Sequence, residues 1–232
     1  MVPGKPDPVT TAVISTNIQI SWTKPEHFGS EITSYKVLIL AADGVSLVDD
    51  GTFCSSVTGL QCTIPMDTLT DPAGLFQLPL NAPIQATVRA VNGLGAGPYS
   101  DLNTDESYDG VAYAKTIPDT PTLPPIRFES TTTVSLITVE MPEIVSGSDE
   151  AGGADITSYN LEWNEGSGTT FTEVIGESVD NADRAVPVVT TPGDTYLFRY
   201  RVKNIYGFST GYSPVASFLS AKAPEPPAVV IT

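Results

Sequence analysis

The chain has 232 residues, a formal net charge of -16 at pH 7, one His and two Cys. This acidity excludes general binding of nucleic acid, which needs clustered Lys and Arg to displace counterions from phosphates. One His and two Cys also cannot supply a four-ligand zinc site unless carboxylates complete it. The hydrophobic content of 41% is that of a globular protein, so the acidity does not by itself imply disorder.

Short apolar runs and turn signals alternate along the chain and predict β-strands. Apolar side chains recur with period two over residues 18–22, 35–39 and 134–139. Turn dipeptides fall between such runs, including Asp43-Gly44 and Asn92-Gly93. Residues 66–76 come nearest to a helical pattern, which Pro and Gly interrupt, so one short turn is expected there. About seven short strands per 110 residues predict an all-β fold of β-sandwiches.

Internal similarity divides the chain into two units. I-T-S-Y occurs at 32–35 and again at 156–159, and Tyr-Ser occurs at 99–100 and 212–213. Residues 87–92 likewise resemble residues 199–204. The Pro-rich stretch 116–125 lies between the two copies and is typical of a semi-rigid linker.

The expected domains are therefore residues 1–117 and residues 118–223. Residues 224–232 are expected to be a Pro-rich linker followed by the start of a next repeat or an exchanged strand. The longest apolar run, residues 37–42, is far shorter than the roughly 20 residues of a membrane helix. The N-terminus lacks the regions of a signal peptide. We therefore expect no membrane insertion, and either no secretion or a mature or excised portion of a longer protein.

The motifs of both units resemble those of the fibronectin type III family. In the first unit I-x-I-x-W-x-x-P carries Trp22 and Pro25 at the family's core Trp and the Pro that follows it. In the second unit residues 196–204 look like the family's Y-x-F-R-V-x-A-x-N strand. Pro192-Gly193 precedes this strand as in the family's tyrosine corner.

Two positions depart from the family pattern, because the first unit has Ile84 at the tyrosine corner and the second has Val139 near the Trp position. The resemblance implies two tandem, immunoglobulin-like, seven-stranded β-sandwiches joined by a Pro-rich linker. Such modules are similar to the repeat arrays of large cell-surface and extracellular proteins.

Cys54 and Cys62 are candidates for a disulfide. If the segment between them folds back as a hairpin, their Cα atoms come within about 5.5–6 Å, the usual range for this bond. The alternative is a pair of reduced thiols that act as small core residues. A paired cysteine count and sandwich modules suit an oxidising compartment. We therefore predict the disulfide and an extracellular or cell-surface location.

Asp105, Ser107 and Asp109 match the first half of a calcium loop, D-x-S-x-D-G, with oxygen ligands at alternate positions. The twelfth position is Thr116 rather than the bidentate Glu, and no flanking helices are predicted. We therefore prefer an acidic solvated loop, with calcium as the alternative, and expect no other cofactor.

Residues 207–211 match G-x-S-x-G, the nucleophile-elbow pattern, with Ser209 at its centre. That chemistry needs a strand-to-helix turn and a His general base. No helix is predicted after Ser209, and the single His, His27, belongs to the other unit. We therefore expect a Gly-Ser turn and no enzymatic activity.

Tyr206, Phe208 and Tyr212 fall in one predicted turn and its flanks, and aromatic side chains dominate the hot spots of protein interfaces. The alternative is that they pack within the module. The main functional hypothesis is a non-catalytic structural or spacer segment. It extends to filaments formed by end-to-end β-strand addition through Val229, Val230 and Ile231. The other hypothesis is a loop-presenting adhesion or receptor module, so the expected partners are proteins or further copies of the repeat.

Overall fold

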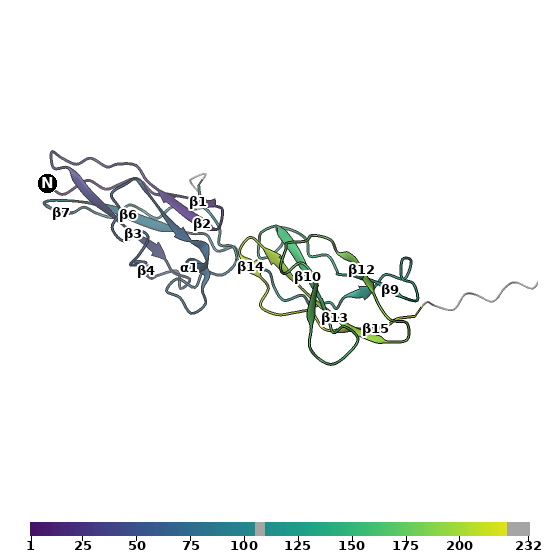
Figure 1. The fold of residues 1–232 in the computed structure, drawn as a ribbon. Helices are drawn as coiled ribbons and strands as arrows, with labels where there is room; N and C mark the ends of the chain where they lie inside the picture. Colours follow the sequence, from purple (N-terminus) through teal and green to yellow (C-terminus); the bar gives the residue numbers. More distant parts are fainter. Residues whose placement is uncertain (105–109, 222–232) are drawn as a thin grey trace, which may run out of the picture. The chain divides into compact units, whose positions relative to one another are not determined.

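The computed structural model describes residues 1–104 and 110–221, which fall into two compact units divided after Thr116 (Figure 1). The division lies one residue before the boundary expected from the sequence. Each unit is built from antiparallel strands, and no helix in the described part of the chain is long and apolar enough to cross a membrane.

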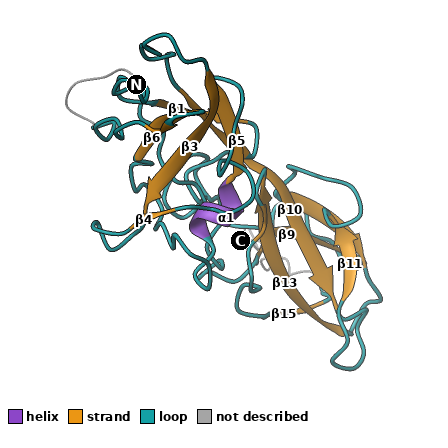
Figure 2. Cartoon of the chain, turned by 90° about the vertical axis from the view of Figure 1, so that its left-hand side faces the viewer, coloured by secondary structure: helices purple, strands orange, loops and turns teal. Residues whose placement is uncertain are grey.

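The described residues of the first unit form two sheets. One has the order β1-β2-β5 and the other has the order β4-β3-β6-β7. The strands are β1 (Thr10–Ile14), β2 (Asn17–Ser21), β3 (Ile32–Leu40), β4 (Leu47–Val48), β5 (Gln61–Pro65), β6 (Ala86–Asn92) and β7 (Gly95–Ala96). The short helix α1 (Met66–Thr70) follows β5, where the sequence predicts one turn (Figure 2).

The described residues of the second unit repeat this arrangement. One sheet has the order β12-β9-β8, and the other has the order β11-β10-β13-β14, with β15 also pairing with β13. The strands are β8 (Ile126–Arg127), β9 (Leu136–Glu140), β10 (Ile156–Trp163), β11 (Thr172–Ile175), β12 (Ala185–Val189), β13 (Thr195–Asn204), β14 (Gly207–Phe208) and β15 (Ala216–Leu219). The last strand of the sandwich is therefore split into β14 and β15.

Each unit buries a core of its own, made from alternate residues of the facing sheets. In the first unit the fully buried side chains include Ile18, Ile20, Ile64, Ile84 and Val88. In the second unit they include Ile137, Val139, Leu161, Phe198 and Val202. In β2, β3 and β13, alternate residues are buried, as the period-two pattern predicts.

The two units place their core Trp differently. Trp22 follows β2 and its ring lies 5.4 Å from that of Tyr35, centroid to centroid. In the second unit the counterpart of Trp22 is Met141 rather than Val139, because its backbone N–H donates to the carbonyl of Arg184 as that of Trp22 donates to the carbonyl of Leu60. Met141 is fully buried, and Trp163 at the end of β10 stacks on Tyr196 at 5.5 Å. The second unit therefore has a buried methionine at the core Trp position, and its single Trp lies on the facing sheet, partly buried against the core.

The tyrosine corner expected in the second unit is confirmed. The backbone N–H of Thr191 donates to the Tyr196 hydroxyl oxygen at 2.7 Å. In the first unit Ile84 occupies the matching position, is fully buried, and donates its backbone N–H to the carbonyl of Ala112 at 2.8 Å. The first unit thus fills this position with a buried apolar side chain, which cannot form the corner hydrogen bond.

Candidate functional site

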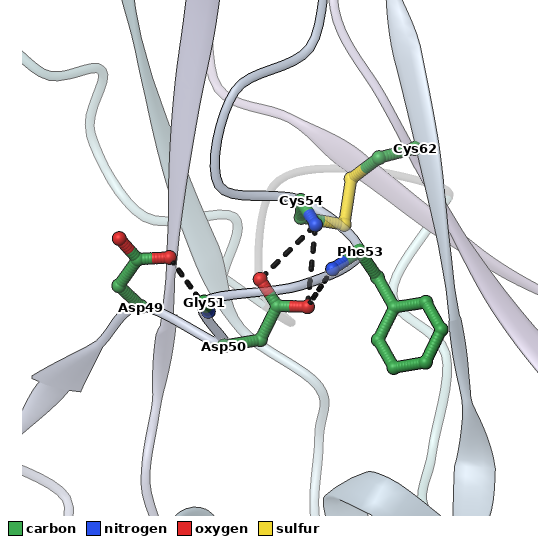
Figure 3. The surroundings of a disulfide bond; sticks show 6 residues. All are labelled: Asp49, Asp50, Gly51, Phe53, Cys54 and Cys62. Atoms are coloured by element: carbon green, nitrogen blue, oxygen red, sulfur yellow. Dashed lines mark hydrogen bonds between the residues drawn. A yellow bond between two sulfur atoms is a disulfide. The ribbon is translucent and has the colours of Figure 1, made fainter.

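The Cys54–Cys62 disulfide is present in the structure, with the two Cα atoms 5.5 Å apart. Cys62 lies on β5, opposite Ile20 of β2. Cys54 lies beside the other sheet, where its carbonyl accepts the backbone N–H of Val37 on β3 at 3.3 Å. The bond therefore joins β5 to a segment that lies beside β3 of the other sheet (Figure 3), whereas the sequence suggested a bridge within a hairpin.

Two carboxylates hold the segment that carries Cys54. Asp50 accepts the backbone N–H groups of Phe53 and Cys54, and Asp49 accepts that of Gly51 (Figure 3). Asp49 also pairs with Lys36 of β3 at 2.8 Å, and the Lys36 hydrogen bond holds the pKa of Asp49 below its ordinary value. Backbone N–H groups and a lysine thus neutralise these acidic side chains.

The two motifs that recur in the sequence meet in each unit. In the first unit the Arg89 guanidinium on β6 lies 4.7 Å from the centre of the Tyr99 ring. In the second unit Arg201 on β13 lies 4.9 Å from the centre of the Tyr212 ring. The following serines, Ser100 and Ser213, accept the backbone N–H of the strand residue just before the Arg. The repeated Tyr-Ser motif therefore positions an aromatic ring over a repeated Arg.

In the second unit the cations of this sheet face are all paired with carboxylates. The ion pairs join Arg199 to Glu162 at 2.6 Å, Arg201 to Glu177 at 2.6 Å and Lys203 to Asp180 at 2.7 Å. The rings of Phe171, Phe208 and Tyr212 lie over the same three cations. On this face, each of the three cations is therefore neutralised by a carboxylate and lies against an aromatic ring.

Glu162 is the most buried carboxylate on this face, with 5% of the residue exposed. Besides Arg199, it accepts the hydroxyl of Tyr212 at 2.7 Å. Burial, with the negative Glu162 beside it, raises the pKa of Tyr212 to about 12. Sequence patterns do not single out Glu162, because it looks like any exposed glutamate on alternate positions of a strand.

The structure brings together only part of the predicted aromatic cluster. Phe208 and Tyr212 both lie over Arg201, at 4.3 and 4.9 Å. Tyr206 is half-buried, and in the described part of the chain it makes no ring contact with either of them. Its backbone N–H donates instead to the side chain of Asn204, at the end of β13.

Ser209 is a structural residue of the turn, as the sequence predicts. It is 1% exposed, its hydroxyl donates to the carbonyl of Gly211, and its backbone N–H donates to the carbonyl of Val202. The strand β14 precedes it and no helix follows among the described residues. The G-x-S-x-G match therefore lacks the geometry of a nucleophile elbow.

The calcium-loop residues Asp105, Ser107 and Asp109 lie outside the described residues, as do Val229, Val230 and Ile231 of the predicted assembly strand. In residues 1–104 and 110–221, no group of three or more His, Cys, Asp or Glu side chains is arranged to hold a metal ion.

Comparisons with known proteins address the fold. The family model for the fibronectin type III domain matches residues 4–104. Among solved structures, the FN1–FN3 domains of chicken CNTN1 are similar at 16% identity with a TM-score of 0.41. That match covers 95% of this chain and 67% of the chicken chain. A search of curated proteins found no match. The first unit is a member of the fibronectin type III family, and the second unit repeats its pair of sheets.

Proposed function

We propose that the chain is a non-catalytic structural segment of an extracellular or cell-surface repeat protein, in which it spaces or presents neighbouring modules. The observation that carries this proposal is the disulfide of the first unit. Disulfides persist in oxidising compartments and are rare where glutathione keeps thiols reduced. A module that keeps such a bond buried is suited to the outside of a cell.

The architecture of the two units, each of which buries a core of its own, supports a spacer role. A residue with the pattern of a catalytic serine, Ser209, is buried and bonded to the backbone. Modules of this kind contribute length and spacing rather than a reaction centre.

The test is the state of the two cysteines in the native source. Intact cells are treated with a membrane-impermeant amine label, and the protein is then alkylated without reduction and analysed by peptide mass spectrometry. We expect labelled lysines together with a linked Cys54–Cys62 peptide pair. Alkylated thiols on an unlabelled chain would place the protein in a reducing compartment and contradict the proposal.

Assembly by strand addition is a finer form of the same proposal. It is supported by the apolar run that holds Val229, Val230 and Ile231 after a Pro-rich stretch. A free strand of this kind adds to an open sheet edge through main-chain hydrogen bonds. Light scattering of the chain with and without residues 224–232 tests it. The full chain should form larger particles, and equal sizes would exclude this route.

The second candidate function is an adhesion module that binds a protein through the aromatic residues of the second unit. Its support is the position of Phe208 and Tyr212, which are half-buried and held in place by Arg201. Tyr206→Ala and Phe208→Ala should then reduce adhesion to cells while the melting temperature stays unchanged. Tyr212 is left out of this test, because any substitution that removes its hydroxyl also deprives the buried Glu162 of a hydrogen-bond donor and so lowers stability.

A further inference from the structure

The two units place different residues opposite an equivalent arginine. In the first unit the register places Lys36 of β3 opposite Arg89 of β6. In the second unit Asn160 of β10 lies opposite Arg201 of β13, and Arg201 Nε donates to the Asn160 side-chain oxygen at 3.0 Å. Two like charges directly opposite each other destabilise a sheet. The first unit thus keeps an unfavourable cation pair where the second has a hydrogen bond.

Arg89 has no counter-ion within the described part of the chain. Its neighbour Lys36 is paired with Asp49, and no described carboxylate forms an ion pair with Arg89. Its counterpart Arg201 is bound to Glu177 at 2.6 Å. The first unit is acidic, with 12 Asp and Glu against 5 Lys and Arg in residues 1–117, so this unpaired cation is not the result of a shortage of acids.

The Arg89 guanidinium is also partly removed from water. Its Nε atom is shielded from solvent and has no acceptor among the described residues. The Tyr99 ring covers one side of the group at 4.7 Å. A desolvated donor without an acceptor destabilises the folded state. A carboxylate that bound the guanidinium would therefore gain more binding free energy than it would at a fully hydrated cation.

Apolar side chains lie next to Arg89 on the outer face of the sheet. Tyr35, Val37 and Ile39 point into the core, so Lys36, Leu38 and Leu40 share the outer face of β3. Leu38 and Leu40 are half-buried, and Leu47, opposite Leu40 on β4, is 43% exposed. An unpaired cation therefore stands beside a strip of partly exposed leucines.

We infer that Arg89 anchors a binding site on the outer face of β3 and β6 for an acidic and apolar segment of a partner protein. A carboxylate of the segment pairs with the guanidinium, whose planar fork matches that group, and an apolar side chain packs on the leucine strip. Polyanions such as nucleic acid are disfavoured, because the first unit carries net negative charge. This role adds to the spacer function and does not depend on it.

The probe for this site is a fluorescein-labelled hexapeptide of alternating Glu and Leu, compared with the same peptide carrying Gln for Glu. Binding to the full chain is followed by fluorescence anisotropy at low ionic strength. We expect the Glu peptide to bind at least tenfold more tightly than the Gln peptide, with affinity that falls as salt is added. Equal affinities, or no binding of the Glu peptide at millimolar concentration, would overturn the inference.

Arg89→Gln and Arg201→Gln form a matched pair of variants, since they remove equivalent arginines from the two units. Arg89→Gln should weaken binding of the Glu peptide at least tenfold, and Arg201→Gln should leave it unchanged. In the wild-type chain, the Arg89 Nε–Hε NMR signal should shift as the Glu peptide is added. This measurement tests the site even if Arg89→Gln does not fold. An equal loss in both variants, or an unmoved Arg89 signal, would place the binding elsewhere.

Discussion

At the scale of single residues, the molecule relies on side chains whose surroundings change their chemistry. Tyr212 is the clearest case, because its hydroxyl donates to the buried Glu162 and its ring covers Arg199 and Arg201. Burial, followed by the effect of Glu162, raises its pKa to about 12. The phenol therefore stays protonated over a pH range in which an exposed tyrosine ionises.

The difference in stability between the wild type and Tyr212→Phe is expected to depend on pH. Near neutral pH the variant should be less stable by about 1–3 kcal/mol, because the buried Glu162 loses a hydrogen-bond donor. Between pH 10 and 12 the unfolded tyrosine loses its proton while the folded one keeps it, so the wild type loses stability as the pH rises. The two free energies of unfolding should therefore converge over that range. Urea titrations at pH 8, 10 and 11 measure the difference, and a constant value would refute the account.

Gly176→Ala is expected to be far more damaging than Gly168→Ala. Both glycines have positive φ, +88° and +72°, so alanine costs each about 1–2 kcal/mol of backbone strain. A Cβ at Gly176 would also overlap the carbonyl oxygen of Tyr159, whereas nothing lies within 4 Å of a Cβ at Gly168. The overlap should add about 1–3 kcal/mol. Denaturant midpoints compare the two variants, and similar losses would contradict the steric argument.

At the scale of elements, the disulfide joins a segment beside β3 to β5 of the opposite sheet. Its main effect is on the unfolded chain, in which it closes a loop of about nine residues. The chain-entropy relation gives about 2–3 kcal/mol for a loop of this size.

Replacing both Cys54 and Cys62 by Ser should therefore lower the stability of the first unit by about 2–3 kcal/mol. The second unit should keep its stability, because its core contains neither residue. The indole N–H signals of Trp22 and Trp163 report one unit each in NMR-monitored unfolding. Equal shifts of both transitions would show that the two units do not unfold separately.

The sequence predicts several of the strands, but it does not predict most side-chain contacts between them. Period-two alternation predicts β2, β3 and β9, and the Pro-Gly pair before Tyr196 predicts the tyrosine corner, because these signals are local. The contact between Arg89 and Tyr99 depends on how the segment after β7 lies against β6. The match of Met141 to Trp22 likewise depends on how β9 pairs with β12. Neither feature leaves a local pattern.

At the scale of the whole molecule, negative charge is spread over both units. Residues 1–117 carry a net charge of -7 and residues 118–232 carry -9. Charge of one sign repels itself within a compact unit and destabilises the folded state, while it keeps separate molecules apart in solution.

Added salt is therefore expected to stabilise the chain. Raising NaCl from 10 to 300 mM shortens the Debye length from about 30 Å to well below 10 Å and screens this repulsion. The melting temperature should rise by a few degrees, as measured by calorimetry at pH 7. A fall would mean that the ion pairs of the second unit, such as Arg199–Glu162, outweigh the general repulsion.

The bond between Cys54 and Cys62 also limits how far the chain can extend under load. When a pulling force unfolds the first unit, the residues between the two sulfurs stay folded into the loop and do not lengthen. At about 3.3–3.6 Å per residue, the bond withholds roughly 2–3 nm of contour length, which reduction would release. A tether built from such modules would therefore have a reach that depends on the redox state of its surroundings.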